Sequence, residues 1–169
     1  MEQMKMILRL EKQALIVKSL TEGVSAEQAV WKPAAESWSI LEVINHLADE
    51  EREDFRSHLN TLLHDPQGEW HPIDPQGWVI GRGYNQRELV ASLEDFLSER
   101  KRSLGWLRSL TSPDWDQGRQ APWGLLRAGD VMAAWAAHDL LHIRQLVELH
   151  WAYGQLHSQP YDVRYAGDW

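Results

Sequence analysis

Two histidines spaced four residues apart, His138 and His142, are the side chains best suited to chemistry in this 169-residue chain. They lie in a segment with helical periodicity, so their imidazoles would stack on one face about one turn apart. Together with Gln145 they occupy three consecutive positions of an otherwise apolar seam. Polar groups in a buried seam are hydrogen-bonded or bind something. Two imidazoles at this spacing can share one metal ion.

A second pair at the same spacing is His46 with Glu50. A helical wheel places His46 at the margin of the apolar face of its segment. Two interpretations remain open: a solvated polar edge, which the periodicity favours slightly, or a third metal ligand. The acidic run beside this pair is interpreted as a solvated face. It comprises Asp49, Glu51, Glu53 and Asp54. The remaining histidines are interpreted as surface or structural residues. They are His58, His64, His71, His150 and His157.

Composition limits the class of protein. The length suggests one domain spanning residues 1–169. There is no cysteine, so a metal site must use His, Asp or Glu. The net charge of −8 argues against nucleic acid as the main partner. No apolar run has membrane length and the N-terminus lacks a signal-peptide core, so we expect a soluble cytoplasmic protein without membrane contact.

Helical periodicity predicts an all-α four-helix bundle that positions these side chains. We expect the second helix to begin at a capping box formed by Ser39 and Glu42, and Gly154 to cap the fourth. We expect loops at 64–85, as a cover for a site, and at 111–128, no strands, and an aromatic tail packed on the body. The expected helices span 2–22, 40–63, 85–110 and 129–153, and the tail carries Tyr161, Tyr165 and Trp169.

Three ordered motifs resemble the DinB/YfiT-like superfamily of metalloenzymes. They are Trp31-x-Pro33, Glu36-Ser37-Trp38-Ser39-Ile40-x-Glu42-Val43-x-x-His46-Leu47 and His138-Asp139-x-x-His142-Ile143-x-Gln145. The resemblance implies an up-down-down-up bundle with a long crossover between the second and third helices. It also implies a homodimer and a bound divalent metal ion. Nickel or zinc is the first choice for this ion, and iron or manganese is the second. By motif position the metal ligands would be His46, His138 and His142.

The resemblance further implies an enzyme that uses this ion to activate a water or a low-molecular-weight thiol, as a thiol S-transferase or a hydrolase on a small molecule. Glu50 is then the candidate for proton transfer or for orienting the bound water, with a fourth ligand or a surface carboxylate as its open alternatives. Gln145 is the candidate for supporting a ligand or contacting substrate. Asp139 lies off the histidine face of its helix. Two alternatives stay open: a dimeric metal-binding or stress-response scaffold without turnover, and a polar core network without metal. Four tryptophans are candidates to wall the pocket, with core packing the favoured role for Trp38 and Trp135. They are Trp38, Trp70, Trp78 and Trp135.

Overall fold

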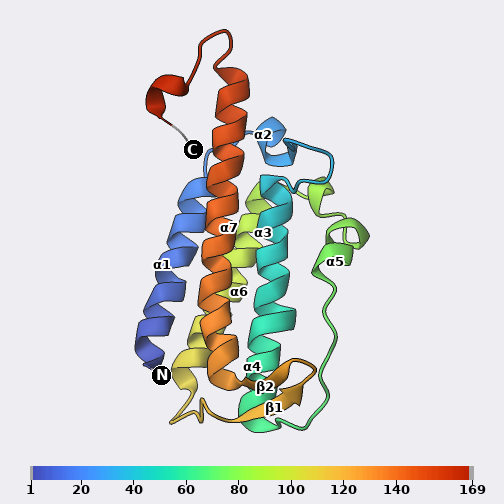
Figure 1. Ribbon diagram of the computed structural model, residues 1–169, viewed down its shortest axis with the longest axis vertical. Coiled ribbons are helices and arrows are strands. Elements are labelled where there is room, and N and C mark those ends of the chain that lie inside the picture. Colours follow the sequence, from blue (N-terminus) through green and yellow to red (C-terminus); the bar gives the residue numbers. More distant parts are fainter. Residues whose placement is uncertain (1, 168–169) are drawn as a thin grey trace.

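The computed structural model of the chain describes residues 2–167, and it is mostly helical (Figure 1). Four long helical segments lie side by side, as the periodicity predicts. The long helices are α1 (Gln3–Thr21), α3 (Ile40–Asp49) continued by a π-helical segment (Glu50–Phe55) into α4 (Arg56–His64), α6 (Leu89–Ser109) and α7 (Ala128–His157). The shorter elements are α2 (Ala26–Val30), α5 (Pro75–Gly81), two 3₁₀ turns (Tyr84–Gln86 and Arg164–Ala166), β1 (Gly118–Ala121) and β2 (Gly124–Arg127).

The connection between α4 and α6 runs along the length of the bundle, so α6 begins beside the start of α3 (Figure 1). Successive contacts confirm that the two helical segments run in the same direction. Asn45 donates to the hydroxyl of Ser92 at 3.0 Å, and further along Arg56 donates to the hydroxyl of Ser103 at 3.0 Å. Figure 1 shows α1 and α7 running in the opposite direction. This arrangement places α7 beside α3, antiparallel to it.

Two apolar clusters form the core, one toward each end of the bundle. Apolar side chains of α1, α4, α6 and α7 build one cluster, including Leu10, Leu59 and Trp135. Those of α1, α3, α6 and α7 build the other, including Val43 and Phe96. Between the clusters lies a buried polar layer. Its members are Gln13, Glu51, Arg100 and Asp139.

The 64–85 segment, predicted to be a structureless loop, contains α5. Asp74 accepts a hydrogen bond from the amide of Gly77 at 3.0 Å, and Pro75 occupies the first turn. These residues therefore start a helix inside the expected loop, because an Asp cap followed by Pro suits a helix start as well as a turn. The third helix begins at Leu89, later than predicted. Asn85 instead accepts a hydrogen bond from the Ser39 hydroxyl at 2.6 Å and fastens the connection to α3.

Three further expectations were wrong, for the 111–128 segment, the end of α7 and the tail. The 111–128 segment contains an antiparallel hairpin of β1 and β2, whose four-residue strands are too short to show alternation. Helix α7 continues through Gly154 to His157, since one glycine costs a long helix only about 1 kcal/mol. Tyr161 and Tyr165 are exposed, so these tail aromatics do not pack on the body, and Trp169 lies outside the described residues. Within the described residues no helix combines the length and apolarity needed to cross a membrane.

Candidate metal centre

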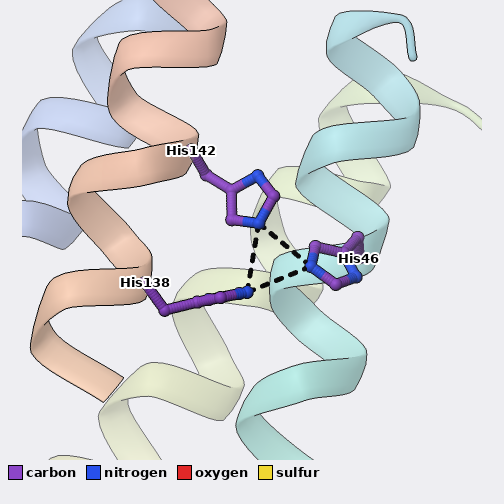
Figure 2. A group of neighbouring side chains, drawn as sticks. All are labelled: His46, His138 and His142. Carbon is purple, nitrogen blue, oxygen red and sulfur yellow. Dashed lines mark hydrogen bonds between the residues drawn. The ribbon is translucent and has the colours of Figure 1, made fainter. Parts of the chain in front are cut away.

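Three histidine side chains from two helices meet at one point. His46 comes from α3, and His138 and His142 come from successive turns of α7 (Figure 2). The Nε2 atom of His46 lies 3.3 Å from that of His138 and 3.0 Å from that of His142. The remaining Nε2–Nε2 distance, between His138 and His142, is 3.1 Å. Within residues 2–167 this is the one group of three His, Cys, Asp or Glu side chains close enough to share an ion.

The spacing of the nitrogens fits a shared divalent cation. Two nitrogens each about 2.0–2.1 Å from a tetrahedral zinc lie roughly 3.3 Å apart, close to the observed separations. Nδ1 of His142 lies 2.8 Å from Oε1 of Gln145, which can only accept a hydrogen bond. Nδ1 of His142 is therefore the protonated nitrogen, and its Nε2 keeps a free lone pair.

Burial keeps these imidazoles neutral. It lowers the pKa of His46 to about 2, with further contributions from His142 and His138. It also lowers the pKa of His138 to about 3, helped by His142, and lowers the pKa of His142. A metal ligand must be unprotonated, so all three rings are ready to bind a cation at neutral pH.

His46 does not lie at a solvated edge as the wheel suggested, because it is only 3% exposed. All ten residues of α3 are buried, so other elements cover the polar face of this helix as well as its apolar face. Trp38 closes the side that the wheel left open: its ring meets the His46 ring edge-on at 4.8 Å and stacks near His142 at 6.1 Å.

Glu50 lies against the histidine group. It is 3% exposed, and its Oε1 atom is 3.7 Å from Nδ1 of His46. Within residues 2–167 neither of these two buried atoms has a hydrogen-bond partner. Burial raises the pKa of Glu50 to about 9, and a hydrogen bond with Asp54 adds to the shift. The carboxyl group is therefore protonated at neutral pH and can carry a proton at the site.

The acidic residues beside Glu50 are not a solvated face. Asp49 is 3% exposed and Glu51 is 1% exposed. Asp49 accepts hydrogen bonds from Arg82 at 2.6 Å and from Arg52 at 2.9 Å, so it fastens the α5 region to α3. The prediction of a solvated run was wrong because α3 and the π-helical segment are covered by arginine-bearing elements on several sides.

Behind the histidines lies a residue that the sequence interpretation missed, Arg100 on α6. Its guanidinium binds Asp139 through two hydrogen bonds of 2.7 and 2.8 Å and Glu51 through Nε at 2.8 Å. Asp139 therefore holds α7 to α6 and does not support an imidazole. A signal was present: Arg100 follows Phe96 by four residues on the apolar face of its helix, the same kind of seam interruption that drew attention to His138.

Comparison with known proteins agrees with the arrangement of the helices. The family model described as the DinB superfamily matches residues 9–146. The chain belongs to this superfamily. A solved structure of YfiT from Bacillus subtilis is similar, with a TM-score of 0.78 and 21% identity, over 90% of this chain and 88% of that one. YfiT is described as "a probable metal-dependent hydrolase with an unusual four-helix bundle topology". No curated protein matches the chain.

In this DinB-superfamily chain a cleft of about 520 Å³ opens over the histidines. Glu50, Gln145 and Trp38 line it together with the three rings, and Pro75 and Gln76 of α5 border it. The segment expected to cover a site thus contributes the start of α5. Of the other candidates, Trp70 stacks on His58 at 3.9 Å and Trp78 lies under Arg82. Trp135 is in the core, which is the role that the sequence favoured for it.

Proposed function

We propose that the chain is a metal-dependent enzyme that acts on a small molecule by activating a water or a low-molecular-weight thiol, as a hydrolase or a thiol S-transferase. His46, His138 and His142 would hold the divalent cation, nickel or zinc. The observation that carries the proposal is the convergence of three neutral Nε2 atoms within 3.0–3.3 Å at the wall of a cleft. The description of YfiT as metal-dependent supports it.

A divalent cation held by these three neutral imidazoles would supply Lewis-acid chemistry, because it would keep its full charge and lower the pKa of a water or thiol bound to it. The chain's own residues do the rest. Gln145 fixes His142 in the tautomer whose Nε2 carries the lone pair. Protonated Glu50 can donate its proton to a leaving group. The carboxylate then left can accept the proton of the attacking water or thiol, which returns Glu50 to its starting state.

Metal content tests the site. Tag-free protein dialysed against nickel or zinc should carry about one ion per chain by elemental analysis. Replacing His138 or His142 with Ala should abolish binding. His157→Ala is the matched control, because His157 is an exposed histidine on the same helix. Protein that binds no ion, with stability unaffected by a chelator, would leave the polar-network alternative standing.

Turnover separates the enzyme from the scaffold. The metal-loaded protein should be assayed with low-molecular-weight thiols and an electrophile, and in parallel with activated esters. We expect activity that disappears in His46→Ala and is retained in His157→Ala. Turnover that survives the loss of His46 would contradict the mechanism, and a metal-loaded protein inert to both substrate classes would favour the scaffold. Sedimentation analysis checks the homodimer that the resemblance implies.

A further inference from the structure

The cleft over the histidines continues into a second arm. This outer arm, of about 650 Å³, shares Trp38, Gln76, His142, Gln145 and Glu148 with the histidine arm. Beyond them it reaches the segment before α3 and the last turns of α7. A molecule reacting at the histidines can therefore extend along the outer arm, whose chemistry then selects the substrate.

The charged side chains that line the outer arm are all acidic. They are Glu36, from the segment before α3, and Glu148, on α7. Within the described residues no ion pair is made by Glu36, whereas Glu148 has a 3.3 Å contact with Nε of Arg144, which lines only the histidine arm. Carboxylates on both sides of a cleft concentrate cations there. The net charge of the chain, −8, acts in the same direction.

Aromatic surface accompanies these carboxylates. The indoles of Trp38 and Trp151 and the ring of Pro33 line the same arm. Indole faces attract ammonium and guanidinium groups and also cover the methylene chains that carry them. An independent sign that the cleft receives a ligand is Oε1 of Glu50. It lies in the wall of the histidine arm, buried and without a hydrogen-bond partner in residues 2–167.

We propose that the outer arm is a substrate subsite for a cationic group, an ammonium or guanidinium, held between the carboxylates of Glu36 and Glu148 and against Trp38 and Trp151. The substrate is then a small molecule with its reacting end at the histidines and a positively charged tail. This assignment rests on the proposed function for the reacting end, but the charge preference belongs to the outer arm itself.

Three thiols that differ only in their tails test the subsite: aminohexanethiol, mercaptohexanol and mercaptohexanoate. Calorimetric titration into zinc-loaded protein should show the amine binding roughly fivefold to tenfold more tightly than the alcohol, with the carboxylate weakest. The Glu36→Gln/Glu148→Gln variant should lose this preference. Glu27→Gln/Glu94→Gln should keep it, because it removes the same charge from exposed positions outside the cleft. Arg144→Gln should increase the preference, since it frees Glu148.

Equal affinity for the amine and the alcohol, or a preference that persists unchanged in Glu36→Gln/Glu148→Gln, would overturn the subsite. A failure of the proposed function looks different: zinc does not bind, and the three thiols lose their common anchor. Hexylamine and hexanol are then titrated into the metal-free protein. A preference for hexylamine that depends on Glu36 and Glu148 supports the subsite without the metal, and its absence overturns it.

Discussion

The guanidinium of Arg100 donates two hydrogen bonds, of 2.7 and 2.8 Å, to the carboxylate of Asp139. Asp139 directly follows His138, one of the candidate metal ligands, in the sequence. The side chains of Arg100 and Asp139 are almost fully buried. The same guanidinium binds Glu51, which also accepts a hydrogen bond from the indole of Trp135 at 2.7 Å. This network joins α6, α7 and the π-helical segment directly behind the histidines, so it fixes the helix that carries two of the three rings.

Replacing Arg100 with Ala should therefore destabilise the protein strongly. The change leaves the carboxylates of Asp139 and Glu51 buried and facing each other, which costs about 3–5 kcal/mol of unfolding free energy. Urea unfolding followed by circular dichroism measures it. Arg102→Ala is the control: Arg102 pairs with Glu99 but its side chain is 67% exposed, so the loss should stay below about 1 kcal/mol. Similar losses for the two variants would show that the buried network is not essential.

Gln145→Ala should weaken metal binding without affecting the fold. The hydrogen bond from Nδ1 of His142 orients that ring, and loss of such a partner typically costs 10–100-fold in metal affinity. Competition with a zinc-binding dye measures the change. Gln155→Ala, at an exposed position of the same helix, should bind zinc like the wild type. Equal zinc affinities in the two variants would contradict the proposal that Gln145 orients His142 for metal binding.

The histidines should make the metal-free protein sensitive to acid. In the unfolded chain they take up protons below their ordinary pKa of 6.5, whereas the folded state holds the pKa of His46 at about 2 and that of His138 at about 3. The unfolded state then binds more protons, so stability falls as the pH falls from 6.5 toward 3. Urea unfolding between pH 7.5 and 4.5 should show a steeper loss for the wild type than for His46→Asn/His138→Asn. Parallel pH profiles would contradict the burial-driven shifts.

The sequence predicted the helices and the α7 histidines because both follow from periodicity. A polar residue in an apolar seam is visible without coordinates, and the same rule would have found Arg100. The depth of His46 could not be found in this way, since a wheel describes one helix and not the neighbours that cover it. Trp38, α5 and α6 bury the rest of α3, and these are tertiary contacts between distant parts of the chain.

The misread acidic run has a related cause. Charged residues in sequence are taken as solvated, yet Asp49 at the end of α3 and Glu51 in the π-helical segment are buried against arginines. Their partners are Arg52 in the same segment, Arg82 just after α5 and Arg100 on α6. No local pattern links a glutamate to an arginine about fifty positions away. The β1–β2 hairpin was not predicted because its four-residue strands are too short to show the alternation of apolar and polar residues.

Glu50→Gln should separate proton transfer from metal binding. The amide keeps the shape of the carboxyl group but cannot give up a proton, so zinc content should stay unchanged while turnover falls by about 10²–10⁴. The exposed Glu69→Gln variant is the control and should remain fully active.

The stability of the metal-free protein checks Glu50 independently of activity. The folded state raises the pKa of this carboxyl from 4.5 to about 9, so between these values the folded state binds the extra proton. Stability then falls as the pH rises through this window, opposite in sign to the histidine effect. Urea unfolding from pH 6 to 9 should therefore show the wild type losing stability relative to Glu50→Gln. A constant difference across this range would place the Glu50 carboxylate in a solvated environment and remove it as the proton carrier.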